Sequence, residues 1–235
     1  MNIADKLTTI AENVPKVYEA GKQARDDRFW NIFQKNGVRR NYNSGFAYWY
    51  GELFEPKYDL IANNSSNMFY HFNNWLTTEP INFIELCSRL NIKMDFSGVA
   101  STAAYMFYSA KISHLPEIDL SNAMNLSYAF NGSKISYIEK LKLSNSQAQT
   151  FSYTFNNCSA LKHCIFEGTI AQNGFNVSSC VELDYESLLS ILDCLGNKTD
   201  DIGGTEWVVT LGATNLSKLT DAEKASATQK GWTLA

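Results

Sequence analysis

Tyr128-Ala129-Phe130, followed by Lys140-Leu141-Lys142-Leu143, contains the two motifs whose repetition sets the architecture of this 235-residue chain. The Tyr-any-Phe motif occurs four times. Its phenylalanines stand at positions 72, 107, 130 and 155, so successive copies lie 35, 23 and 25 residues apart. Self-similarity at such intervals is typical of supersecondary units that stack on one another rather than of a single globular core.

The second motif alternates apolar and polar residues, as a strand does when one of its faces is buried. Its copies end at Phe96, Leu120, Leu143 and Phe166, which lie 24, 23 and 23 residues apart. This spacing predicts parallel rungs, one per repeat, with the phenylalanines of the first motif in single file inside. A period near 23 lies in the leucine-rich-repeat range, so the predicted fold is an α/β leucine-rich-repeat solenoid.

The polar positions of the rungs are predicted to form two columns on the exposed surface. One column contains Lys93, Glu117, Lys140 and His163, and the other contains Asp95, Asp119, Lys142 and Ile165. Exposed faces of solenoids commonly bind partners, so these eight residues are the candidate binding residues. The alternative is that this charged face only keeps the protein soluble and binds no partner.

Asp95 and Asp119 occupy matching rung positions, and two neighbouring carboxylates are the catalytic pair of a glycosidase. Lysines on the same face would hold both acids ionised, whereas a general acid needs a raised pKa. No nucleophile elbow, phosphate-binding loop or zinc-protease helix is present in the sequence. We therefore predict a protein without catalytic residues.

The N-terminal residues carry a heptad seam, in which apolar side chains alternate steps of four and three. The seam consists of Ile3, Leu7, Ile10, Val14 and Val17. We predict that residues 1–40 form an anchoring helix that associates with copies of itself, with a trimer as the expected number. Pro15 interrupts a continuous helix, so a helix folded back on its own chain is the alternative.

The rest of the chain divides into three parts. Residues 41–64 are rich in aromatic side chains and are predicted to cover the first repeat, or alternatively to stack on sugars. Residues 65–183 contain the repeats, with an inserted helix over 79–90 that accounts for the longer first interval. Residues 184–235 are predicted to form a helix-strand-helix-strand C-terminal cap, with Asp184 and Thr220 as helix N-caps.

Composition excludes several classes of function. The net charge of −4 and the pI near 5.4 disfavour a broad nucleic-acid or anionic-membrane surface. No apolar run is long enough for a membrane span, and no export segment opens the sequence. The five cysteines lack the spacing of a zinc site, so we predict buried thiols, no metal and no cofactor.

The run Phe151-Ser-Tyr-Thr-Phe-Asn-Asn-Cys-Ser-Ala-Leu161, followed by Phe166-Glu-Gly168, resembles the BspA-type leucine-rich repeat. In that repeat an aromatic residue, two polar residues and a cysteine precede a leucine. Ser133 and Ala110 replace the cysteine in the other repeats, and the resemblance covers roughly residues 65–180. The two ends, residues 1–22 and 219–233, are similar to the flanks of repeat proteins encoded by phages and prophages of gut bacteria.

The resemblance implies a non-enzymatic structural protein of a virion, in a tail fibre or attached to the capsid, that mediates attachment to a host. The implied partners are further copies of the chain, other virion proteins and a host surface protein or glycan. The implied location is the virion, after synthesis in the bacterial cytoplasm. The alternative is a BspA-like adhesin on the bacterial surface or secreted, which the lack of an export segment disfavours.

Overall fold

The computed structural model describes residues 60–61, 80–82, 84–85, 94–96, 99, 101–200 and 203–235. The predicted N-terminal helix with Ile3, Leu7, Ile10, Val14 and Val17 lies outside them. So do Lys93 and most of the aromatic segment 41–64.

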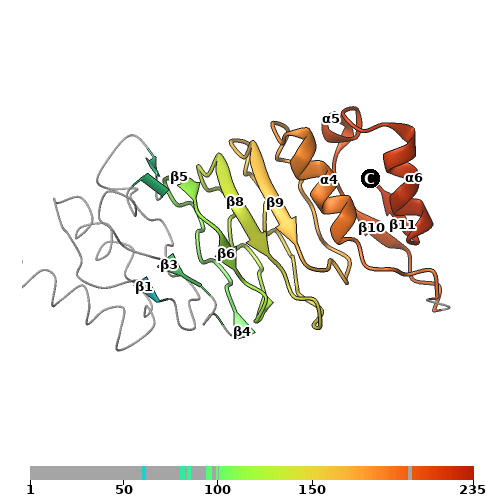
Figure 1. The fold of residues 1–235 in the computed structure, drawn as a ribbon, viewed down its shortest axis with the longest axis horizontal. Helices are drawn as coiled ribbons and strands as arrows, with labels where there is room; N and C mark the ends of the chain where they lie inside the picture. The colour runs from blue at the N-terminus through green and yellow to red at the C-terminus, as the bar shows by residue number, and fades with distance from the viewer. Residues whose placement is uncertain are drawn as a thin grey trace, which may run out of the picture.

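Parallel strands cross the middle of the molecule (Figure 1). The main sheet contains five strands: β2 (Ile81–Asn82), β5 (Ile112–Leu115), β6 (Ile118–Asp119), β8 (Tyr137–Lys142) and β9 (His163–Glu167). Strands β5 and β6 both pair with β8, β5 along its first half and β6 along its second. They form one rung that is interrupted between Leu115 and Ile118, where Pro116 has no amide hydrogen to donate.

Further parallel pairs flank this sheet. Strand β1 (Leu60–Ile61) pairs with β3 (Met94–Asp95), and β4 (Ser101–Thr102) pairs with β7 (Ala123–Asn125). The Tyr-any-Phe segments are hydrogen-bonded to one another in the same sense. The amides of Tyr105, Phe107 and Ser109 donate to the carbonyls of residues 127, 129 and 131, and the next segment repeats this pattern toward residues 152, 154 and 156.

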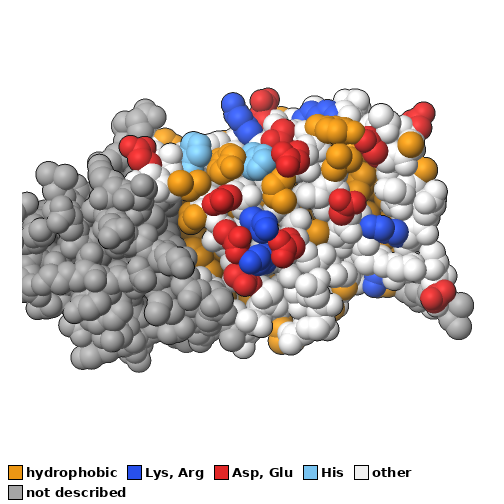
Figure 2. All heavy atoms as spheres, in the orientation of Figure 1, with side chains coloured by type: hydrophobic (Ala, Val, Ile, Leu, Met, Phe, Trp, Pro, Cys, Tyr) orange, Lys and Arg blue, Asp and Glu red, His pale blue; other side chains and the backbone are white. Residues whose placement is uncertain are grey.

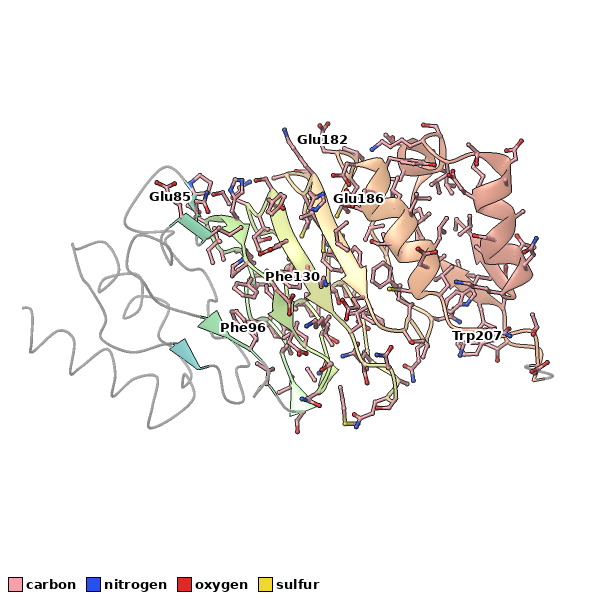
Figure 3. The ribbon with its side chains drawn as sticks, in the orientation of Figure 1. Glu85, Phe96, Phe130, Glu182, Glu186 and Trp207 are labelled. Atoms are coloured by element: carbon pink, nitrogen blue, oxygen red, sulfur yellow. The ribbon has the colours of Figure 1, made fainter. Side chains whose placement is uncertain are left out.

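The core contains a file of stacked phenylalanines. Phe107, Phe130 and Phe155 are at most 1% exposed, and successive ring centroids lie 5.3 Å apart with interplanar angles of 8° and 3°. Figure 3 shows Phe130 and Phe96 in the interior of the body, and Phe96 extends the file at 6.1 Å from Phe107. The prediction that these three rings stand in single file is confirmed.

The C-terminal residues form helices and short strands beside β9 (Figure 1). The elements are α4 (Tyr185–Cys194), β10 (Trp207–Val209), α5 (Ala213–Leu216), α6 (Asp221–Gln229) and β11 (Trp232–Leu234). The predicted N-cap at Asp184 and the capping box of Thr220 and Glu223 are confirmed. Parallel bridges join Ile170 to Leu195 and Asn176 to Thr210, so parallel pairing continues into this part of the chain. The short helix α5 was not predicted.

The prediction of an inserted helix over 79–90 is wrong at its start. Ile81 and Asn82 form strand β2 and pair with β5, and residues 84 and 85 are helical. The side chain of Asn82 accepts a hydrogen bond from the amide of Glu85, as the side chain of a helix N-cap does. Pairing with a neighbouring strand overrides the local helix signal around Pro80. Residues 86–90 lie outside the described part.

Within the described residues, no helix combines the length and the apolar character that crossing a membrane requires.

Candidate functional site

The first candidate surface is the charged outer side of the rungs. We call it the strand face and define it by Glu117, Asp119, Lys140, Lys142 and Glu167. Figure 2 shows basic side chains surrounded by acidic ones over the strands. Lys140 Nζ lies 2.8 Å from Glu167 Oε2 on β9, and Lys142 Nζ lies 2.5 Å from Glu117 Oε1, directly before β6. The two lysines of β8 therefore pair with carboxylates on opposite sides of that strand, one in β9 and one in the link between β5 and β6.

These ion pairs fix the charges of the strand face. The hydrogen bond to Glu167 raises the pKa of Lys140, and the hydrogen bond to Glu117 raises the pKa of Lys142. The hydrogen bond from Lys140 lowers the pKa of the Glu167 carboxyl. A carboxyl with a lowered pKa is a poor proton donor at neutral pH, so the surface is arranged for ionic contact rather than for general acid catalysis.

The two aspartates of the glycosidase hypothesis are not joined by strand pairing in the described residues. Strand β3 places Asp95 opposite Ile61 of β1, whereas Asp119 lies opposite Lys142 of β8. The carboxylate of Asp119 accepts hydrogen bonds from the amide and the hydroxyl of Ser121, at 3.0 and 2.6 Å. That carboxylate therefore takes part in a local turn.

The predicted alignment of the last rung is wrong. His163 lies opposite Tyr137 rather than Lys140, and Lys142 lies opposite Glu167 rather than Ile165. Paired residues of β8 and β9 lie 26 residues apart at Tyr137 and 25 apart at Lys142, with a register shift between Ile138 and Leu141, whereas the predicted alignment used 23. Glu167 therefore joins the strand face, which the sequence did not predict. The 25-residue interval from Phe130 to Phe155, which equals that from Lys142 to Glu167, was the signal that could have revealed it.

The shifted register also builds a row of rings at the start of the rungs. His114, Tyr137 and His163 stack with centroid distances of 5.6 and 4.7 Å. His163 contacts Asp184, the N-cap of α4, and Ile165 is half-buried in the middle of β9. Of the predicted binding residues, Glu117, Asp119, Lys140 and Lys142 lie together, whereas His163 belongs to this second row.

The second candidate surface is a ladder of tyrosines from the Tyr-any-Phe motifs, which sequence reasoning assigned to no site. We call Tyr105, Tyr128 and Tyr153 the tyrosine ladder. Their rings stack with centroid distances of 4.8 and 5.0 Å and interplanar angles of 3° and 20°. Tyr153 ends the ladder: among the described residues its ring contacts only that of Tyr128, and it is 58% exposed. One face of its ring is therefore open to solvent.

All three tyrosines adopt left-handed backbone conformations, with φ of 58°, 58° and 56°. This conformation costs an L-residue roughly 1–2 kcal/mol, and a stacked ring pair contributes about 0.5–1.5 kcal/mol. Four residues further on, the same conformation recurs at Ser109, Gly132 and Asn157, where glycine and asparagine reduce that cost. The three tyrosines thus keep a strained backbone conformation at equivalent positions of their repeats. Backbone strain of this kind clusters at binding and catalytic sites.

The tyrosine ladder lies in segments that carry no charge. We call these segments, 101–110, 120–133, 143–161 and 168–181, the neutral flank, because none contains Asp, Glu, Lys or Arg. The charged residues between positions 101 and 167 all fall in 111–119, 134–142 and 162–167, in or beside the main-sheet strands. In Figure 2 the charged side chains gather over the strands, with largely uncharged surface below them. The two candidate surfaces therefore differ in chemistry.

The buried thiols supply no further site. Cys158, Cys164, Cys180 and Cys194 are buried and free, and burial raises the pKa of each thiol, to about 11 for Cys158. The prediction that these four are buried is confirmed, and Cys87 lies outside the described residues. Comparison of the chain with known families, curated proteins and solved structures finds no match in any of the three.

Proposed function

We propose that this protein is a non-enzymatic attachment protein, built on a leucine-rich-repeat solenoid and carried in a bacteriophage particle as a tail, fibre or capsid-attached component. The solenoid is supported by parallel pairing of segments 23 to 26 residues apart and by the file of Phe107, Phe130 and Phe155. The phage context is supported by the resemblance of the repeat and of the two chain ends to phage-encoded repeat proteins.

One observation carries the proposal of attachment: the repeats present two organised surfaces of different chemistry. The strand face offers alternating charges already held in cross-strand pairs, and a protein partner binds such a surface by exchanging these contacts for its own. Its partner is a neighbouring virion protein. The tyrosine ladder and the neutral flank are then available for recognition outside the particle.

The proposed anchor is the N-terminal heptad seam of Ile3, Leu7, Ile10, Val14 and Val17, through which copies of the chain associate. Light scattering of the purified full chain then gives a mass that is a multiple of 26.4 kDa. Ile10→Asp with Val14→Asp puts charges into the seam and is expected to shift the mass to the monomer. A wild-type chain that stays monomeric at high concentration contradicts the anchor.

The location is tested with particles purified from the bacterium that encodes the chain. Antibodies raised against the full chain are expected to decorate one fixed place on the particles, and mass spectrometry to find the protein in the purified fraction. Its absence from particles overturns the proposal. Its presence on the surface of cells that release no particles favours the bacterial adhesin.

A further inference from the structure

The segregation of charge in the repeats indicates what kind of molecule the tyrosine ladder suits. Around Tyr153 the chain reads Gln-Ala-Gln-Thr-Phe-Ser-Tyr-Thr-Phe-Asn-Asn over residues 147–157 and offers hydroxyl and amide groups without a formal charge. A nucleic acid or an acidic glycan is held mainly by Lys and Arg, and the neutral flank has neither. The ladder therefore suits an uncharged, polar ligand.

Two hydrogen-bonding side chains next to Tyr153 are unused in the described structure. Ser152 and Asn157 are exposed, and neither side chain has a hydrogen-bond partner among the described residues. Asn157 has a left-handed conformation like that of Tyr153, with φ of 58° against 56°. An open aromatic face beside unused hydroxyl and amide groups matches a sugar ring, which has an apolar C–H face and a rim of hydroxyls.

A protein partner fits this surface less well. Protein interfaces need an apolar core of several buried side chains, whereas the large apolar side chains exposed in the described residues are only Met124, Tyr153, Val181 and Tyr185. In the tyrosine ladder the inner ring faces are covered by stacking, which leaves the outer face of Tyr153 and the phenol edges. One open ring suffices for a sugar and is a small anchor for a protein.

We propose that the tyrosine ladder is a binding site for a neutral glycan, with the open face of Tyr153 stacking on a sugar ring. The phenol edges of the ladder, together with Ser152 and Asn157, hydrogen-bond the sugar hydroxyls. Because the rings repeat at 4.8 and 5.0 Å along one direction, an extended glycan can contact successive rungs. The inference deepens the proposed function, on which it rests, by naming the class of ligand recognised outside the particle.

The test uses the full chain on an array of neutral oligosaccharides and polysaccharides, with sulfated and uronic-acid glycans as the comparison. We expect binding to at least one neutral glycan, with little change between low and high salt because no ionic contact is involved. Tyr153→Ala and Tyr153→Gly are expected to weaken it at least about tenfold. Tyr153→Phe keeps the ring and is expected to stay within about threefold of wild type.

Two controls separate binding from folding. Tyr185→Ala removes another exposed tyrosine, on α4 and off the ladder, and leaves glycan binding unchanged. Tyr153→Gly relieves the left-handed strain, so this variant is expected to unfold at a urea concentration no lower than Tyr153→Ala while losing binding equally. If Tyr153 had a structural role alone, the variant that is more stable in urea would also retain more glycan binding.

Several outcomes overturn the inference: no neutral glycan bound, binding to charged glycans alone, or Tyr153→Ala within threefold of wild type. If the array is silent and Tyr153→Ala instead abolishes binding to a surface protein, the partner is a protein and the glycan inference fails. The proposed function fails separately. If the chain binds a neutral glycan but is absent from particles, the glycan inference stands and the proposed location in the particle is overturned. If the chain is found in particles but binds no glycan, the proposed location stands and the glycan inference is overturned.

Discussion

His163 Nδ1 lies 2.6 Å from Asp184 Oδ2, and this contact joins strand β9 to the first turn of helix α4. The same carboxylate accepts a hydrogen bond from the amide of Ser187 and thereby caps the helix. Burial raises the pKa of Asp184, but the hydrogen bonds from Ser187 and His163 outweigh it, so the pKa lies below its ordinary value of 3.8. The ionised carboxylate therefore stabilises the folded state.

The first prediction concerns the loss of this carboxylate. Asp184→Ala removes the cap and the contact with His163, and we expect it to lower the free energy of unfolding at pH 7 by about 0.5–2 kcal/mol. Asp184→Asn keeps the capping oxygen and loses the charge, so its effect is expected to be smaller. Urea unfolding followed by tryptophan fluorescence measures both. Equal losses in the two variants would show that the charge, not the cap, is what matters.

The pH dependence of the same group has a definite sign. A carboxyl with a lowered folded-state pKa contributes stability that is complete above its unfolded pKa and is lost as the pH falls through the folded one. We therefore expect the difference between wild type and Asp184→Asn to be present at pH 5 and above and to shrink below about pH 4. A difference that persists unchanged at pH 2 contradicts this assignment.

The second prediction concerns the phenylalanine file. Phe130 stacks between Phe107 and Phe155 and is 1% exposed, so Phe130→Ala leaves a cavity between two rings. The expected loss is about 3–5 kcal/mol, whereas Phe130→Leu fills part of the space and is expected to lose about 1–2 kcal/mol. Met124→Ala, at a 54% exposed position, is the control and stays within about 0.5 kcal/mol. If Phe130→Ala were as stable as Met124→Ala, the side chain of Phe130 would not belong to the core.

The parallel pairing and the phenylalanine file were predictable because each repeat places the same residue types at nearly the same spacing. The caps at Asp184 and Thr220 were predictable because capping is a local effect of a few neighbouring residues. The register of β9 was not, because the apolar residue that ends its alternation, Phe166, pairs with Leu141 and not with Leu143. Two residues is one strand period, so the burial pattern looks the same in either register.

The tyrosine ladder could not be predicted from the local sequence, for a different reason. Tyrosine does not favour the left-handed conformation, and nothing in Tyr-any-Phe predicts it. The conformation accompanies pairing between repeats, since the amides of Tyr105 and Tyr128 donate to the carbonyls of Ser127 and Ser152 in the next repeat. The strand at Ile81–Asn82 was missed in the same way, because its pairing with β5 outweighs a local helix signal.

The third prediction concerns the buried thiols. Burial raises the pKa of Cys158 to about 11 and that of Cys194 to about 12, against an ordinary 9.0. At neutral pH a rise of two units lowers the thiolate fraction about a hundredfold, and burial also blocks access. We expect Cys158, Cys164, Cys180 and Cys194 to be alkylated by iodoacetamide at least about a hundred times more slowly in the folded chain than in urea. Peptide mapping assigns each site, and rapid labelling of Cys158 in the folded chain would contradict its burial.

The fourth prediction compares two glycines with similar backbones and different surroundings. Gly168 has φ of +115°, and a Cβ there would lie 2.3 Å from the carbonyl oxygen of Leu143, whereas Gly174 has φ of +98° and nothing within 4 Å of that position. Both alanine variants carry backbone strain of about 1–2 kcal/mol. Gly168→Ala must also push two rungs apart where the amide of Leu143 donates to the carbonyl of Glu167 at 2.7 Å.

We therefore expect Gly168→Ala to lose at least about 1–3 kcal/mol more than Gly174→Ala in urea unfolding, because the extra cost is steric and falls on backbone that cannot move aside. The difference between the two variants cancels the shared strain and measures the close approach of the rungs alone. Equal losses in the two variants would mean that β8 and β9 separate easily at this end. The strand face would then lose the rigid spacing that holds Glu167 within reach of Lys140.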